Sequence, residues 1–303
     1  MPIYVKDGGT WREISSSAGT QLYVRDATSF TNKTIINAYV KDGGSWRTTF
    51  TLFDTTGYSS AVGSVAVPAN ANAIHVQYAV GGGSGGVKGA EYDKAGGESA
   101  GAGGASGAYI SDKVFSVTGG ETLTITAGTA GAASTGSAYN TTAGSGSATS
   151  ITGSTSGSLF SLAGGTGGSG TGGGVQGPLR SNNASVGGAA TISGTVLTTG
   201  TTVDGLNITT FNSGPVGTFN SNGSGTAGTN PDNCSGDNCS ITGGNGGASY
   251  AGPGAVSGGS GAPAGGSGSA GTRGSGGGGG GAQPQSSGSD GGAGELNYRF
   301  MRM

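Results

Sequence analysis

The amino-acid sequence predicts an all-β protein in which glycine backbone fills much of the interior. Three observations support this prediction: short stretches alternate between apolar and polar residues, glycine accounts for 72 of the 303 residues, and no segment has a convincing helical period. The apolar fraction is 32%, whereas globular domains usually reach about 45–50% counted with glycine. Side chains alone are therefore too few for an ordinary core.

The first residues contain a threefold repeat. The segments IYVKDGGTWREI (3–14), LYVRDATSFTNKTI (22–35) and AYVKDGGSWRTTF (38–50) each place tyrosine, valine, a basic residue and aspartate in the same order. An aromatic residue follows each tyrosine after seven positions. This spacing predicts β-hairpins in which a tight turn reverses the chain and the two aromatic residues meet across the strands. We expect a hairpin-repeat domain over residues 1–51 and a glycine-rich domain over residues 52–303.

Two roles are open for the aromatic residues of the repeats. They can form the core of the small domain, or one aromatic face can dock on another protein of a larger assembly. Trp11 and Trp46 are the candidates for such an assembly contact.

Short strands are predicted at intervals beyond residue 52. Residues 74–80 alternate between a set of larger residues, Ile74, Val76, Tyr78 and Val80, and the residues His75, Gln77 and Ala79. This alternation is typical of a half-buried strand. A second hairpin is predicted around Gly119-Gly120, which apolar alternation flanks on both sides. Further strands are expected at residues 149–151, 158–162, 191–197, 206–211 and 295–300.

Long glycine tracts lie between these strands, chiefly at 164–174, 243–247 and 258–281. They lack the strict Gly-X-Y period and the proline content of collagen. Two interpretations remain: solvated flexible linkers, or extended polyglycine II helices that pack side by side through backbone hydrogen bonds. We favour packed helices, because the tracts recur between strands that must return to one sheet.

Composition argues against several classes of function. The net charge is −2, so no basic field is available for nucleic acid. No stretch approaches the ~20 apolar residues that span a bilayer, so membrane insertion is not expected. The only histidine, His75, has no nucleophile to pair with in the sequence, and we assign it a structural role. We therefore expect no catalytic residues, no cofactor and no enzymatic activity.

Cys234 and Cys239 are the only cysteines, with four residues between them. A local disulfide formed after release from the cell, a pair of free thiols, and a metal ion shared between copies all remain open. Two cysteines do not by themselves complete a zinc site, so no metal site is expected within one chain.

Several segments resemble a known family. FDTTGYSSAVGSVAVPANANAIHVQYAVGGGSGG, GGASGAYISDKVFSVTGGETLTITAGTAG and, towards residue 300, GSGGGGGGAQ and DGGAGELNYRF occur in an order similar to that of the glycine-rich domain of phage tail-fibre and other virion proteins. The resemblance spans roughly residues 53–300. It implies a β-sandwich-like scaffold whose strands are joined by glycine-rich excursions.

The resemblance also implies a function. We expect a structural component of a bacteriophage virion, made in the host cytoplasm and exposed on the released particle. It would be a tail-fibre or tail-tip protein that presents loops for host-surface recognition, with residues 1–51 attached to other tail or capsid proteins. The alternative is a purely architectural protein, such as a capsid decoration or tail connector without a receptor. Many phage fibres are trimeric, so the resemblance implies a homotrimer.

Candidate receptor contacts are aromatic and amide residues in and near the less glycine-rich stretch 176–242. Ordinary loop packing is the alternative role for each of them. The candidates are Phe211, Asn212, Phe219, Asn220 and Tyr250.

Overall fold

The protein is described by a computed structural model that contains two compact units, Met1–Asp54 and Thr55–Met303. In the first unit, and in parts of the second, only the backbone of the strands is described. The remaining described residues are 58–69, 71–88, 101–134, 142–168, 187–197, 243–249, 258–261, 267–279 and 287–301. This part of the chain contains strands and extended segments and no helix, so the all-β prediction is confirmed.

The first unit consists of three antiparallel hairpins, one for each sequence repeat. The pairs are β1 (Ile3–Asp7) with β2 (Thr10–Ile14), β3 (Leu22–Asp26) with β4 (Ser29–Lys33), and β5 (Asn37–Asp42) with β6 (Ser45–Thr51). Two residues separate the strands of each hairpin, the loop length that favours the tightest hairpin turns. Each hairpin is its own two-stranded sheet.

The register adds detail to the sequence prediction that the two aromatic residues of each repeat meet across the strands. Trp11 stands directly opposite Lys6, and Tyr4 stands opposite Glu13. Because successive positions of a strand alternate between its faces, all four share one face, and Tyr4 and Trp11 are diagonal neighbours across the hairpin.

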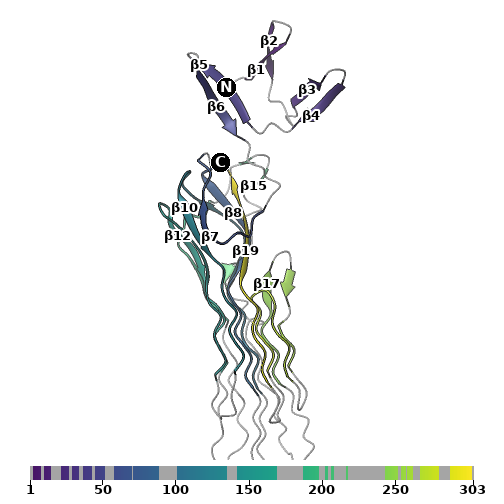
Figure 1. Ribbon diagram of the computed structural model, residues 1–303, viewed down its shortest axis with the longest axis vertical. Coiled ribbons are helices and arrows are strands. Elements are labelled where there is room, and N and C mark those ends of the chain that lie inside the picture. The colour runs from purple at the N-terminus through teal and green to yellow at the C-terminus, as the bar shows by residue number, and fades with distance from the viewer. Residues whose placement is uncertain are drawn as a thin grey trace, which may run out of the picture. The chain divides into compact units, whose positions relative to one another are not determined.

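The second unit is built on two larger antiparallel sheets (Figure 1). One has five strands in the order β13-β12-β11-β10-β7, and the other has four in the order β16-β9-β8-β19. The strands of the first sheet are β7 (Gly63–Ala66), β10 (Thr122–Thr126), β11 (Thr149–Gly153), β12 (Gly157–Leu162) and β13 (Ala190–Ile192). Those of the second are β8 (Ala73–Val80), β9 (Tyr109–Ser116), β16 (Val216–Gly217) and β19 (Glu295–Met301).

Two short ribbons complete the strands of this unit. They are β14 (Thr202–Val203) with β15 (Leu206–Asn207), and β17 (Ser249–Ala251) with β18 (Gly254–Val256). The strand that was predicted over residues 206–211 is assigned only over the two residues of β15.

Apolar side chains of the two sheets supply a small core. Phe115 of β9 and Phe160 of β12 are fully buried, with ring centroids 5.6 Å apart. Leu123 and Ile125 of β10 are buried, while Thr122, Thr124 and Thr126, which alternate with them, are exposed, so this strand has one face in the core and one in solvent. Burying one such side chain contributes about 1.5–3 kcal/mol. A second buried apolar cluster, formed by Val87, Ala102 and Ala143, lies among the glycine-rich segments.

Strand β8 differs from its prediction as a half-buried strand. It lies between β9 and β19, and residues of both its faces are buried, including His75 and Ala79. On the face of His75, the Tyr58 hydroxyl lies 2.9 Å from the ring Nδ1. Tyr58 thus covers a face that alternation alone assigned to solvent.

The prediction of a hairpin at Gly119-Gly120 is wrong. Its two strands, β9 and β10, belong to different sheets, so the turn crosses from one sheet to the other instead of pairing its arms. Glu121 explains the geometry: its carboxylate accepts hydrogen bonds from the backbone N–H groups of Thr118, Thr155 and Ser156. The turn is therefore fastened to the β11–β12 turn.

Candidate functional site: the glycine bundle and its far end

Glycine-rich segments leave the two sheets on the same side and run next to one another (Figure 1). Segments 81–88, 128–134 and 163–168 follow strands and lead away from the sheets. Segments 101–108, 142–148 and 287–294 lead back into strands. Neighbouring segments are joined by backbone hydrogen bonds, so the prediction of packed glycine tracts is confirmed for these residues.

Segment 81–88 lies at the centre of a hexagon of other segments. Every third N–H group along it donates to the same neighbouring segment. Gly81, Ser84 and Val87 donate to segment 101–108. Gly82 and Gly85 donate to segment 142–148, and Gly83 and Gly86 donate to segment 287–294. Three residues per turn is the period of a polyglycine II helix.

The carbonyl oxygens of segment 81–88 complete the hexagon. They accept hydrogen bonds from segments 128–134, 163–168 and 275–279. With ~3.1 Å of rise per residue, this central helix is about 25 Å long.

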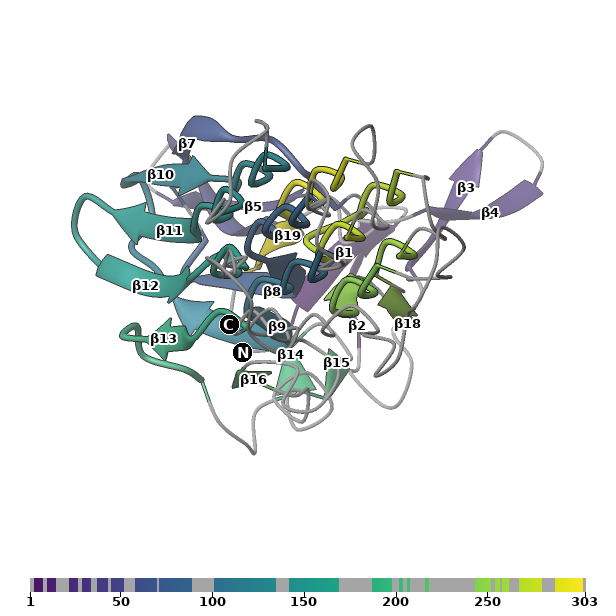
Figure 2. The ribbon, with the colours of Figure 1, turned by 90° about the horizontal axis from the view of Figure 1, so that it is seen from below.

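Segment 275–279 is the centre of a second hexagon that overlaps the first: each centre is a neighbour of the other, and segments 101–108 and 287–294 belong to both hexagons. Its hydrogen-bonded neighbours are segments 81–88, 101–108, 243–248, 258–261, 267–272 and 287–294. The two hexagons together form three hydrogen-bonded layers, which Figure 2 shows end-on. The middle layer contains the two enclosed segments, 81–88 and 275–279.

The enclosed segments are rich in glycine, and the reason is steric. A Cβ atom on Gly83 would overlap the carbonyl group of Ser275, and one on Gly86 would overlap that of Gly278. Backbone atoms of neighbouring helices occupy the space where side chains would be. Ser84 is tolerated because its hydroxyl replaces a backbone partner, accepting a 2.7 Å hydrogen bond from the N–H of Ala105.

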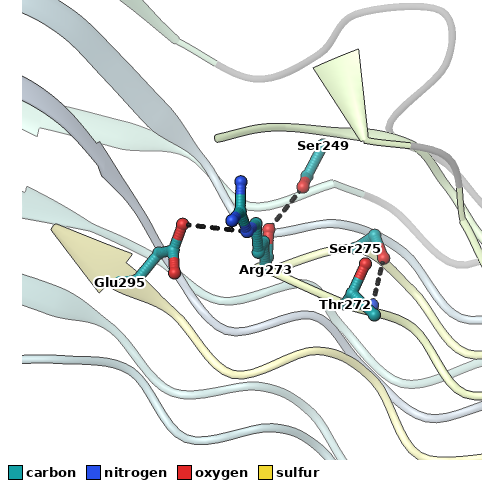
Figure 3. Close-up of polar contacts among 5 residues, drawn as sticks. All are labelled: Ser249, Thr272, Arg273, Ser275 and Glu295. Atoms are coloured by element: carbon teal, nitrogen blue, oxygen red, sulfur yellow. Dashed lines mark hydrogen bonds and ion pairs between the residues drawn. The ribbon is translucent and has the colours of Figure 1, made fainter. Parts of the chain in front are cut away.

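Within the glycine tract 258–281, a tight turn next to the strands separates two packed segments (Figure 3). Thr272 and Ser275 close this turn, with the Ser275 N–H donating to the Thr272 carbonyl. Arg273 and Gly274, between them, both have positive φ, +46° and +72°, which is typical of a type I′ turn. The signal in the sequence is the single Arg-Gly step within the tract.

Three parts of the fold meet at this turn. The Ser249 hydroxyl at the start of β17 donates to the Arg273 carbonyl over 2.5 Å, and the Arg273 guanidinium lies 3.5 Å from the Glu295 carboxylate of β19. The Gly107 N–H donates to the carbonyl of Gly274. The turn therefore fixes the bundle to the strands.

Away from the sheets, the described parts of several helices extend to the same end of the bundle. Lys88, Ser134, Gly168 and Gly279 are the last described residues of outgoing segments, and each is followed in sequence by a connection to another segment. Residues 89–100, 135–141, 262–266 and 280–286 connect such described ends in the sequence. Residues 169–186 lead instead from Gly168 to a segment at the sheet end of the bundle, where the Gly188 N–H donates to the carbonyl of Ser106. This far end is the place to which the fold carries the most separate parts of the sequence, and we take it as the candidate functional site.

Of the residues chosen from sequence as receptor contacts, Tyr250 belongs to β17, whose Ser249 hydroxyl donates to the carbonyl of Arg273. Phe211, Asn212, Phe219, Asn220, Cys234 and Cys239 lie outside the described residues.

Titratable groups in the described part serve the fold. Burial lowers the pKa of His75 to about 3, with the Arg299 charge adding to the effect. The ring is therefore neutral near pH 7, with the Asp112 carboxylate 3.6 Å from Nε2. Within the described residues, no three His, Cys, Asp or Glu side chains are grouped to hold a metal ion, and no helix is long and apolar enough to cross a membrane.

Comparison with known proteins adds one match. A family model described as a glycine-rich domain matches residues 56–300. No curated protein matches the chain.

Proposed function

Because the chain belongs to this glycine-rich domain family, we propose that it is a structural protein of a bacteriophage particle, a tail-fibre or tail-tip protein that presents loops to the host surface. The observation that carries the proposal is the doubly hexagonal bundle. It carries many separate segments of the sequence away from the sheets to one end of the bundle.

A rigid bundle suits recognition for a thermodynamic reason. Ordering flexible loops on binding costs about 0.5–1.5 kcal/mol for each immobilised side chain, and a scaffold that fixes the loop ends in advance reduces that cost. Binding residues are also commonly carried on loops held by a rigid scaffold. The connections at the far end contain aromatic and charged residues, among them Tyr92, Asp93 and Tyr139.

Adsorption blocking tests the proposal. Purified full-length protein should bind host cells and compete with phage for adsorption. A variant with Tyr92→Ala and Tyr139→Ala in the connections at the far end should compete at least tenfold more weakly. Phe211→Ala with Phe219→Ala, which removes two contacts expected from the sequence, is measured in parallel, and a larger loss of competition in this variant would assign recognition to the stretch 176–242 instead. Protein that is found in the particle but binds no host cell would instead support a purely architectural component.

A trimeric fibre, which resemblance to phage fibres implies, can contain this chain in two ways. Three copies of the chain can associate, or one copy can sit on three copies of another fibre protein. Sedimentation of the purified chain separates the two arrangements.

A further inference from the structure

The outward face of the five-stranded sheet carries hydroxyl groups at nearly every position, and we call it the hydroxyl face. The register places outward residues of neighbouring strands opposite one another, and Figure 2 shows the five strands side by side along one side of the unit. Two rows cross the sheet: Ser64, Thr124, Thr152 and Ser158 form one, and Thr126, Ser150, Ser161 and Thr191 form the other. The further outward residues of these strands are Thr122 and Ala66. All ten are exposed or partly exposed.

The hydroxyl face has no charged side chain. Its strands contain no Asp, Glu, Lys, Arg or His, whereas a well-behaved protein surface carries about 25–35% charged residues. The four-stranded sheet of the same unit contains Asp112, Lys113, Glu295 and Arg299. The lack of charge is therefore a property of this sheet and not of every strand in the unit.

The hydroxyl groups are regularly spaced. Neighbouring strands lie about 4.8 Å apart, and alternate residues of one strand are about 7 Å apart. A row over four strands therefore extends for about 14 Å. The array also continues beyond the sheet: Thr129, just after β10, and Ser147, just before β11, are exposed and bring their hydroxyl oxygens to 2.9 Å.

A β-bulge in β12 preserves the row through Thr152. Ile151 pairs with Phe160, and the next residue, Thr152, pairs with Ser158 instead of Leu159. Without the bulge, Leu159 would stand in the outward row. With it, Leu159 is fully buried. Bulges that re-aim a side chain in this way are over-represented next to functional sites.

Serine and threonine side chains can form many weak contacts at once. Each hydroxyl group both donates and accepts hydrogen bonds, and its hydrogen rotates to suit the partner. Threonine is stiff about χ1 because it is branched at Cβ, so it loses little side-chain entropy on binding. Its methyl group adds an apolar contact beside the hydroxyl. The ligand that matches these groups is an uncharged chain with both hydroxyl and C–H groups.

Other classes of ligand fit the hydroxyl face less well. A phosphate or carboxylate ligand is usually held by basic side chains, and the five strands contain none. A lipid surface or the core of a protein interface is usually met by large apolar or aromatic residues. The outward positions of these strands hold none of those either.

We infer that the hydroxyl face binds a neutral polysaccharide, with the sugar chain lying across the strands along a row. Hydroxyl groups of the sugars pair with those of successive strands, and the methyl groups of Thr124 and Thr152 contact sugar C–H groups. This face belongs to the sheet and not to the far end of the bundle. The inference therefore goes beyond the proposed function and does not rest on it.

The test measures retention of the purified full-length chain on beads that carry cellulose, chitin, amylose or mannan. We expect at least one of these neutral polysaccharides to retain the parent, and about 1 M salt to leave retention unchanged, because salt screens only charged contacts. Thr124→Val with Thr152→Val should bind at least tenfold more weakly, since valine keeps the β-branched shape and removes two hydroxyl groups from one row. Thr118→Val with Thr195→Val, at exposed positions outside the hydroxyl face, is the matched control and should bind like the parent.

A lysine variant covers the apolar surface that valine adds. Thr124→Lys should also abolish retention, while thermal unfolding stays unchanged because the position is exposed. The Tyr92→Ala, Tyr139→Ala variant should be retained like the parent; if it is not, polysaccharide binding belongs to the far end and the inference fails.

The remaining outcomes separate this inference from the proposed function. Failure of every bead to retain the parent, or equal retention of the parent and the double valine variant, would overturn the inference and leave adsorption blocking unaffected. Dimerisation that Thr124→Lys abolishes, or shaping of ice crystals, in a protein that binds no polysaccharide would assign the hydroxyl face to another occupant and also overturn it. Loss of adsorption blocking with polysaccharide binding retained would overturn the proposed function alone.

Discussion

Gly278 is a position where the packing of the bundle leaves no room for a side chain. A Cβ atom at this position would overlap the backbone carbonyl of Ser260 in the neighbouring helix. We predict that Gly278→Val lowers the free energy of unfolding by about 3 kcal/mol or more, because backbone cannot move aside as a side chain can. Ala270→Val is the control, since Ala270 is exposed on a neighbouring segment and should change stability by less than about 0.5 kcal/mol. Urea unfolding of both variants measures the difference, and equal midpoints would contradict close packing.

Arg273 has a backbone conformation that its side chain does not favour. Its φ is +46°, where asparagine is accepted and β-branched residues are strained. We predict that Arg273→Val costs about 2 kcal/mol, whereas Arg273→Asn is neutral or slightly stabilising. The lost ion pair with Glu295 matters little in that comparison, because the arginine is 57% exposed and such pairs contribute about 0–1 kcal/mol. Thermal unfolding gives the ranking; a stable valine variant would disprove the assigned turn.

His75 makes stability depend on pH. Its folded pKa is about 3, below the ordinary 6.5, so the unfolded chain binds a proton first as pH falls. The stabilising contribution is complete above pH 6.5 and declines below it, by up to about 1.4 kcal/mol per pH unit until the folded pKa is reached. Because the sequence has one histidine, its ring resonance in NMR is unambiguous and should not titrate between pH 8 and 5. A midpoint near 6.5 in the folded protein would be the contrary result.

At the scale of elements, Glu121 connects two turns of different sheets. Hydrogen bonds from Ser156, Thr118 and Thr155 lower the pKa of its carboxyl below the ordinary value, in spite of burial, which raises it. A lowered folded pKa gives stability that is present above pH 4.5 and lost as pH falls through the folded pKa. We predict that Glu121→Gln lowers the free energy of unfolding at pH 7. The difference in the free energy of unfolding between pH 7 and pH 3 should be smaller in this variant than in the parent. Glu295→Gln, at an exposed ion pair, is the control; identical pH profiles for parent and Glu121→Gln would rule out this role.

Which elements could be predicted from sequence depended on whether their signal was local. Alternation identified β8 and β19, and glycine density identified the bundle, because period and composition act within one segment. The pairing of β9 with β8 instead of β10 could not be predicted from the sequence. The turn between β9 and β10 is held by Glu121, whose partners Thr155 and Ser156 lie more than thirty residues further along the chain. The far end as candidate site was missed for the same reason: hydrogen bonds between distant segments define it, and the named contacts, such as Tyr250, were chosen on residue type.

At the scale of the whole molecule, the lattice makes a prediction about amide exchange. The N–H groups of segments 81–88 and 275–279 are hydrogen-bonded inside complete hexagons, so they should exchange only when the whole unit unfolds. Segment 267–272, at the edge of the lattice, should exchange faster by local opening. Hydrogen–deuterium exchange with mass spectrometry measures both. Equal and rapid exchange of the two enclosed segments would show that the interior is open.

The second enclosed helix has a consequence for how the protein is made. Segment 275–279 fills the centre of a hexagon whose other members begin as early as residue 81, and β19, which follows it, is a partner of β8. The ribosome has translated nearly all of the glycine-rich unit before segment 275–279 or β19 has been synthesised. The nascent chain therefore cannot complete this hexagon, or pair β8 with β19, until its synthesis is nearly finished. A premature stop codon before residue 275 would give a product that lacks the enclosed segment 275–279.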